Sequence, residues 1–210
     1  MPHISERFKL LIGMSFELDK LRLGSLFGHF QDSGPWFGLG QEQHWDPVLA
    51  VFLADRISYP VWEDQASFEC VQSLLQVYSE GFEVGFFSGS DGLYLPYGYT
   101  AYYPIARTSF EELKSQPERW KTRSIAVQPG ERYFCLFNYS VAPSFYKTHF
   151  SYLLMQRYIK RIKKLRASGL VAFVVSEEGG KFAERVFGLK EVGILGSEHG
   201  ERVFAGSFSS

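Results

Sequence analysis

The sequence has little cysteine, no long hydrophobic run and almost no net charge. Its two cysteines, Cys70 and Cys135, are too few and too far apart for a disulfide framework or a CxxC metal motif. The longest clean apolar run, Leu170 to Val175, is far shorter than the roughly 20 residues of a transmembrane helix. The run Leu10 to Met14 is too short for a signal-peptide core. These absences predict a cytoplasmic protein that does not enter a membrane.

Charge of neither sign is in excess. The chain has 22 Lys and Arg against 23 Asp and Glu, a formal net charge of -1, which disfavours a nucleic-acid binder because such a domain is markedly basic. The histidines His29, His44, His149 and His199 are scattered without ligand spacing, so no metal site is predicted.

Apolar and aromatic residues are plentiful, at 45% and 17% of the chain. A chain of 210 residues with this composition can bury a substantial core, and we expect a single domain over residues 1–210. Residues 1–45 show no clear periodicity but contain Trp36 and Trp45 in a Gly-rich loop. We expect this segment to be an N-terminal extension packed on the domain.

The segment from Asp46 to Ile105 predicts two helices and a hairpin. Asp46-Pro47 is typical of a helix start, and a second helix is predicted over 63–79 with Gly81 as its C′ residue. Strands are predicted over 82–87 and 93–105. Because Pro96 and Gly98 interrupt the second strand, we expect it to be bent or bulged.

The following segments predict a strand, helix, strand unit among hairpins. Thr108 or Ser109 is expected to cap a short helix that Pro117 interrupts. Further on, the patterns predict a strand over 132–141, a helix over 148–167, a buried strand over 170–175, a helix over 181–187 ended by Gly188, and a final hairpin. This order predicts an α/β (α+β) mixed sheet with helices on both faces.

The junction between residues 133 and 165 carries the strongest functional signal. A strand ends at Val141-Ala142-Pro143 and a long basic helix follows. Backbone N–H groups at a helix start lack helical partners, so such a junction predicts an anion site. The loop contains no glycine, which is the usual means of letting backbone approach a phosphate.

Over residues 133–208 the chain resembles the GCN5-related N-acetyltransferase (GNAT) family. The resemblance lies in the corner Val141-Ala142-Pro143, the pair Leu153-Leu154 in the long helix, and Phe187-Gly188-Leu189 with Gly193 near the last strands. It implies a central, mostly antiparallel sheet with one parallel strand pair and helices on both faces. It also implies that residues 133–208 are the cofactor-binding half.

What the resemblance implies about function is acyl transfer from acetyl-CoA or another acyl-CoA. The thioester would lie along the end of the strand at Tyr139 to Val141, and the diphosphate would meet the start of the helix. The implied cofactor-binding residues are Tyr139, Val141, Tyr146, Lys147, Thr148, His149, Phe150 and Ser151. No catalytic residue is assigned.

The chain departs from the family pattern where the chemistry is expected. Tyr146 stands at the usual Arg or Gln position, His149 at the first glycine and Ser151 at the second small residue. The short helix lacks the family's frequent tyrosine, with Glu184 and Phe187 in its neighbourhood. A side chain at His149 would hinder the approach of a diphosphate to the backbone.

Several side chains have two interpretations. His149 is a phosphate donor or acid–base group, or it is a surface or capping side chain in the first turn. The cations from Arg157 to Arg166 hold a phosphate or an acidic partner, or they form a solvated face. The aromatic strand with Tyr97 and Tyr99 lines a channel or packs in the core, and a tyrosine hydroxyl or Glu83 is a candidate general base.

Two functions follow from these patterns. The first is an acyltransferase that acts on an amine or hydroxyl acceptor, carried by a small molecule or a protein. The alternative is a catalytically retired GNAT-fold protein that serves as a protein-binding or regulatory module, because the loop glycines and the tyrosine are missing. Nucleic-acid binding through the basic helix is a third and weaker hypothesis, and a homo-oligomeric assembly stays open.

Overall fold

The computed structural model describes residues 35–43, 45–59, 65–88, 94–197 and 200–208. Most of the predicted N-terminal extension, 1–45, lies outside the described residues, as do His29, His44 and His199. The N-terminal half contributes, in chain order, β1 (Trp36–Gly38), η1 (Gln41–Gln43), α3 (Pro47–Ser58), α4 (Phe68–Tyr78), η3 (Ser79–Gly81), β2 (Phe82–Ser88), β3 (Tyr94–Ile105), α5 (Arg107–Ser115) and η4 (Pro117–Arg119).

The C-terminal half contains the predicted strand, helix, strand unit. Its elements are β4 (Tyr133–Val141), η5 (Pro143–Phe145), α6 (His149–Lys164), β5 (Gly169–Val174), α7 (Glu177–Phe187), β6 (Lys190–Ile194) and β7 (Arg202–Ser207).

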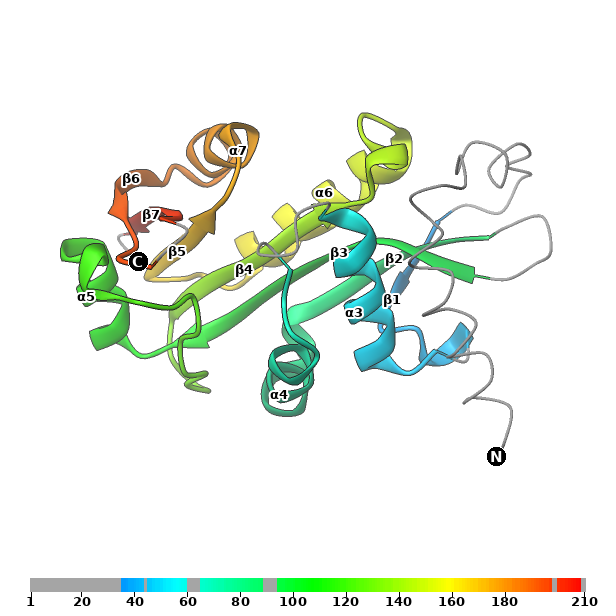
Figure 1. Cartoon of the computed structure of the whole chain (residues 1–210), viewed down its shortest axis with the longest axis horizontal. Coiled ribbons are helices and arrows are strands. Elements are labelled where there is room, and N and C mark those ends of the chain that lie inside the picture. The colour runs from blue at the N-terminus through cyan, green and yellow to red at the C-terminus, as the bar shows by residue number, and fades with distance from the viewer. Residues whose placement is uncertain (1–34, 44, 60–64, 89–93, 198–199, 209–210) are drawn as a thin grey trace.

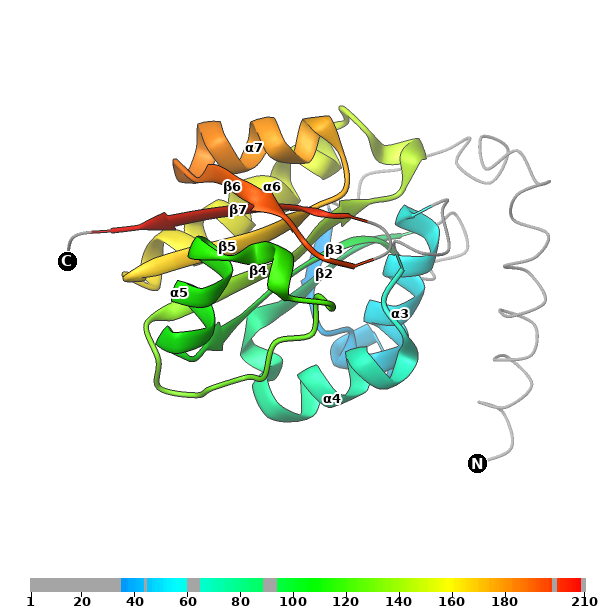
Figure 2. The same ribbon diagram turned by 60° about the vertical axis from the view of Figure 1, so that its left-hand side comes forward.

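The described strands form one seven-stranded mixed sheet in the order β1-β2-β3-β4-β5-β7-β6. β4 and β5 are parallel, and the other neighbouring strands in this order are antiparallel. Helices α3, α4 and α5 pack on one face, and α6 and α7 cover the other, as the two views in Figures 1 and 2 show. The predicted mixed sheet with one parallel pair and helices on both faces is confirmed.

Local capping signals account for most of the helix boundaries. α3 begins as predicted, because the Asp46 carboxylate accepts a hydrogen bond from the Leu49 N–H at 3.0 Å. α4 begins at Phe68, later than predicted, because Ser67 is its N-cap. Gly188 ends α7 in the left-handed conformation, with φ of 67°, as predicted for a C′ glycine.

Two local predictions were wrong. α5 is preceded by Ala106, which makes no side-chain capping bond, so neither Thr108 nor Ser109 is the cap. Gly81 is not a left-handed C′ residue. A Cβ atom there would lie 1.9 Å from the Tyr102 carbonyl oxygen, so glycine is required by close packing against β3.

The predicted irregularity of the aromatic strand is a β-bulge. Gly85 pairs with Gly98 and Phe86 pairs with Pro96, which leaves Tyr97 as the extra residue of β3. Its carbonyl oxygen accepts a hydrogen bond from the Ala142 N–H at 2.7 Å, just beyond the end of β4. The bulge therefore joins β3 to the corner that precedes α6.

Candidate functional site

The parallel strands β4 and β5 separate part of the way along β4. Their pairing runs from Tyr133 with Gly169 to Leu136 with Ala172 and then stops. β4 continues to Val141 beside β3 alone. The sheet therefore opens along the last five residues of β4, at the junction that the sequence singled out.

Two peptide groups of β4 face this opening. Peptide groups point alternately to the two sides of a strand, and the Ala142 N–H points toward β3 because it bonds to Tyr97. By the same alternation Ser140 faces β3, whereas the N–H and C=O groups of Tyr139 and Val141 face the side from which β5 has diverged. These are the positions at which the sequence analysis placed the thioester.

The Tyr139 side chain closes one face of the opening. Its ring is stacked on Phe182 of α7, with centroids 5.3 Å apart, and on Tyr158 of α6 at 6.1 Å. Its hydroxyl donates to the Ser151 carbonyl oxygen at 3.2 Å. Burial, with a smaller effect of Tyr146, raises the pKa of Tyr139 to about 12, so the phenol stays protonated at neutral pH.

The loop before α6 satisfies most of its own N–H groups. Phe145, Tyr146 and Thr148 donate backwards to carbonyl oxygens within the loop, at 2.8, 3.1 and 3.2 Å. The Thr148 hydroxyl oxygen accepts from the Ser151 N–H at 3.4 Å and so occupies the capping position of the helix. Of the predicted anion-binding amides, those of Lys147 and His149 make no hydrogen bond within the part of the chain that the structure describes.

The remaining predicted cofactor residues differ in exposure. Tyr146 is 57% exposed, and Lys147 and His149 are also exposed, with Lys147 in the left-handed region at φ of 60°. Phe150 is half-buried against Tyr97, whose hydroxyl donates to the Phe150 carbonyl oxygen at 3.0 Å. Thr148 rather than His149 caps the helix, so His149 is a surface side chain of the first turn.

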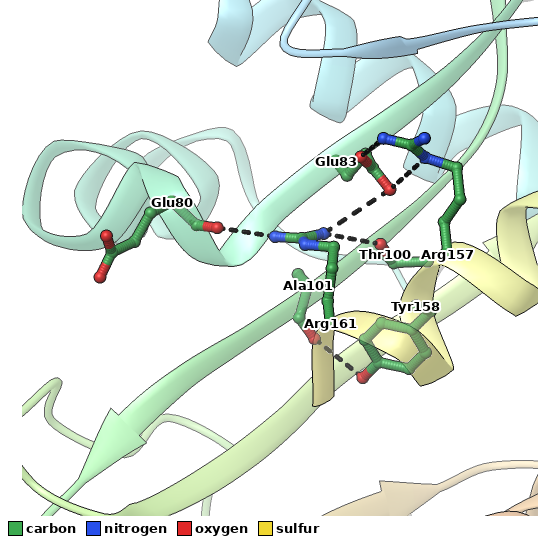
Figure 3. Close-up of polar contacts among 7 residues, drawn as sticks. All are labelled: Glu80, Glu83, Thr100, Ala101, Arg157, Tyr158 and Arg161. Carbon is green, nitrogen blue, oxygen red and sulfur yellow. Dashed lines mark hydrogen bonds and ion pairs between the residues drawn. The ribbon is translucent and has the colours of Figure 1, made fainter. Parts of the chain in front are cut away.

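Two of the helix cations bind a carboxylate that the sequence did not connect with them. Arg157 donates to both oxygens of Glu83 on β2, at 3.1 and 2.6 Å, and Arg161 lies 3.9 Å from the same group (Figure 3). Arg161 also donates to the Glu80 carbonyl oxygen and to Thr100. Glu83 is thus held in an ion-pair cluster, which argues against its role as a general base.

A second buried carboxylate lies on the opposite face of the sheet. Asp55 of α3 is 1% exposed and accepts hydrogen bonds from the Tyr99 hydroxyl at 2.6 Å, the Ala66 N–H at 2.8 Å and the Asn138 side chain at 3.4 Å. Asn138 also accepts from the Tyr59 hydroxyl at 2.7 Å. Burial raises the pKa of Asp55, and its hydrogen bonds oppose this shift.

The network ends at buried polar side chains of β4, on either side of Tyr139. Asn138 and Ser140 flank Tyr139 on β4 and hydrogen-bond to each other at 3.2 Å. Local sequence patterns did not predict this network, because Asp55 and Asn138 are far apart along the chain. The signal available was one carboxylate among the apolar positions of the helix predicted from Pro47.

A cavity, a metal site and a membrane span were also considered among the described residues. A cavity of about 490 Å³ is lined by residues near Tyr78 and Glu131 and by Phe134, at the start of β4 and away from the opening. No group of three His, Cys, Asp or Glu side chains in the described ranges is arranged to hold a metal ion. Among the same residues, no helix is both long and apolar enough to cross a membrane.

Comparison with known proteins identifies the architecture. No family model and no curated protein matches the sequence. Among solved structures, Ard1 from Thermoplasma volcanium is similar with a TM-score of 0.55 and 9% identity, over 85% of this chain and 100% of that one. A GNAT-like decarboxylase, GphF, in complex with isobutyryl-CoA has a TM-score of 0.54 and 13% identity, over 83% and 99%.

The NatC complex bound to Gag peptide and CoA is similar at a TM-score of 0.52 and 9% identity, over 84% of this chain and 100% of that one. The TM-scores establish a shared fold, and the low identities leave the reaction to be argued from the site. The strand order, the single parallel pair and these likenesses agree with the resemblance carried by the corner at Pro143. The chain has the GCN5-related N-acetyltransferase fold, in a divergent form.

Proposed function

We propose that this protein transfers an acyl group from acetyl-CoA or another acyl-CoA to an amine or hydroxyl acceptor. The observation that carries the proposal is the separation of β4 from β5 beyond Leu136 and Ala172. It leaves the peptide groups of Tyr139 and Val141 facing the opening. An extended thioester with its own amide groups can hydrogen-bond to such a strand edge.

Direct attack on the thioester suits this arrangement. The acceptor nitrogen or oxygen forms a bond to the acyl carbon, the carbon–sulfur bond breaks, and the proton lost by the acceptor ends on the departing thiol. Peptide N–H groups fixed beside the acyl carbonyl stabilise the negative charge that develops on its oxygen. Holding donor and acceptor together supplies the remaining advantage by proximity.

We place the acceptor on the α3 face of the sheet. Asn138 and Ser140 place buried polar side chains on that face, and the half-buried Tyr59 donates its hydroxyl to Asn138. Behind them, Asp55 holds Asn138 in position. Asp55 and Asn138 are therefore proposed as positioning residues for the acceptor.

The stretch after the corner is proposed to meet the phosphate end of the donor. Its members are the sequence-predicted residues Tyr146, Lys147, Thr148, His149, Phe150 and Ser151. Lys147 and His149 are exposed and suited to contact a phosphate through their side chains. Thr148 and Ser151 support the turn through their mutual hydrogen bonds.

Titration with acetyl-CoA tests the proposal. A ligand that binds the native state raises the unfolding midpoint, so acetyl-CoA at millimolar concentration should raise it, and a thiol reagent should detect CoA release with an amine panel. The matched ligand control is adenosine 3′,5′-bisphosphate, which lacks the pantetheine arm and should give the smaller shift. Failure of acetyl-CoA and of acetyl-4′-phosphopantetheine alike to shift the midpoint would exclude acyl transfer.

One observation favours the alternative function. Thr148 already caps α6 by accepting from the Ser151 N–H, so part of the helix start is satisfied without a bound anion. A catalytically retired protein-binding module is therefore the second candidate. It predicts that no pantetheine thioester binds and that no thiol is released with any amine.

The broader expectations remain predictions. They are a single domain over 1–210 with residues 1–45 packed on it, a cytoplasmic location, and an oligomeric state that the sequence leaves open. Limited proteolysis and sedimentation velocity measure the first and the last of these.

A further inference from the structure

The candidate site differs sharply between its two ends. Beside Tyr139 and Val141 the sheet is open and offers peptide groups to an extended arm. At the start of α6 most of the loop N–H groups already donate to acceptors within the loop. Since acyl-CoA consists of a pantetheine arm and a bulky nucleotide diphosphate, the two halves of this donor meet two different environments.

The loop environment does not fit a diphosphate cradle. A cradle of this kind needs successive N–H groups directed outward without side chains in front of them. Here the N–H groups of Phe145, Tyr146 and Thr148 donate to carbonyl oxygens of the same turn, and that of Ser151 donates to the cap. The amides of Lys147 and His149, which make no hydrogen bond within the described residues, belong to residues with long or bulky side chains.

The outer face of α6 supplies a second observation. His149, Tyr152, Gln156, Lys160 and Lys163 recur at three- and four-residue spacing, so they form one exposed stripe along the helix. This stripe starts at the mouth of the opening and spans about 21 Å of helix. Tyr152 is 51% exposed.

The charged side chains on the exposed face of α6 are all basic. Residues from Lys147 to Arg166 include no acidic side chain. Arg157 and Arg161 are engaged by Glu83, whereas Lys160, Lys163 and Lys164 form no ion pair with any residue in the described ranges. A surface of this sign and shape complements an acidic protein.

We propose, on the basis of the acyltransferase function above, that the preferred acyl donor is a thioester on the 4′-phosphopantetheine arm of an acidic carrier protein. The arm enters beside Tyr139 and Val141, and its single phosphate lies near Lys147 and His149. The carrier rests on the basic stripe. The acyl carbon bonds to the acceptor as its bond to sulfur breaks, and the carrier keeps the arm as a free thiol that takes up the acceptor's proton.

The first experiment asks whether the nucleotide contributes to binding. Titration calorimetry compares acetyl-4′-phosphopantetheine with acetyl-CoA on the full chain. We expect the two dissociation constants to agree within about twofold, because nothing in the loop holds the nucleotide. A constant for acetyl-CoA lower by about tenfold or more would overturn the proposal and leave the acyltransferase function standing. Failure of both ligands to bind would defeat the acyltransferase function itself.

The second experiment tests the carrier surface. An acetyl-loaded bacterial acyl carrier protein should bind more tightly than the isolated arm, and the double change Lys160→Glu with Lys163→Glu should weaken it by about tenfold. The matched control is Arg107→Glu with Arg119→Glu, two exposed cations at α5 and η4 on the other face, which should leave binding unchanged. Carrier binding no tighter than the arm, or equal losses in both variants, would refute the docking surface.

Discussion

Two buried carboxylates on opposite faces of the sheet are compensated in different ways. Glu83, on the α6 face, is surrounded by the charged groups of Arg157 and Arg161. Asp55, on the α3 face, is surrounded by neutral donors from Tyr99, Ala66 and Asn138. The charge of Glu83 is compensated by the two guanidinium groups, and these ion pairs join α6 to β2. Asp55 relies mainly on hydrogen bonds, with smaller effects of Arg56 and Arg123, and its burial still raises the pKa of the carboxyl.

Truncation of Asp55 should have the largest effect. Asp55→Ala leaves the buried donors of Tyr99 and Asn138 and the half-buried Ala66 N–H without this acceptor, and the loss of a buried bond costs about 1–3 kcal/mol before partial relaxation. We expect the free energy of unfolding to fall by about 3–4 kcal/mol. Urea unfolding measures this free energy. A decrease of less than about 1 kcal/mol would show that water replaces the carboxylate.

Truncation of Glu83 should cost less. Arg157 is 48% exposed at its side chain, so water can solvate its guanidinium when the carboxylate is removed. We expect Glu83→Ala to lower the free energy of unfolding by about 2 kcal/mol, a value discounted for solvent exposure. Urea unfolding of Glu83→Ala, with Arg157→Ala as the partner variant, measures this. A loss greater than that of Asp55→Ala would reverse the comparison.

The two carboxylates should also separate by pH. The pKa of Asp55 is raised above its ordinary 3.8, so the native state binds the proton more tightly than the unfolded chain. Its contribution to stability is complete below that value and is lost as the pH rises through the raised pKa. The stability of the parent relative to Asp55→Asn should therefore fall as pH is raised, in unfolding curves between about pH 4 and pH 7. A constant difference would contradict this.

The smallest effect is expected at the rim of the Asp55 network. Tyr59 is half-buried, and its hydroxyl donates to Asn138 at 2.7 Å. Tyr59→Phe removes one neutral hydrogen bond and should cost about 1 kcal/mol. If acceptor positioning depends on this bond, the variant should raise KM for the acceptor while leaving donor binding unchanged. A change in donor binding alone would place Tyr59 with the donor.

Several features that depend on residues close in the chain were predicted correctly, and several that depend on distant contacts were not. Signals between residues close in the chain, such as Asp46 before Pro47 or Gly188 after Phe187, predicted the helix ends correctly. Gly81 was assigned to the wrong cause because its contact, the Tyr102 carbonyl, comes from another strand.

The candidate site likewise combines local features that the sequence predicts with distant contacts that it does not. The corner at Pro143 and the strand before it were visible in the sequence, and the order of elements placed them in the correct fold. The partners of Arg157 and Asp55 depend on which strands become neighbours, and no local pattern contains that information. The cap of α6 is Thr148, whereas the sequence alone left His149 as an alternative cap.

The opening along β4 has a consequence for amide hydrogen exchange. Ala142 and Ser140 direct their N–H groups into the ladder with β3, whereas Tyr139 and Val141 direct theirs toward the opening. Neighbouring amides on one strand should therefore exchange at alternating rates, fast at 139 and 141 and slow at 140 and 142. A bound pantetheine arm would protect the amides of residues 139 and 141 and so remove the alternation. Amide exchange along this strand therefore detects whether the arm is bound.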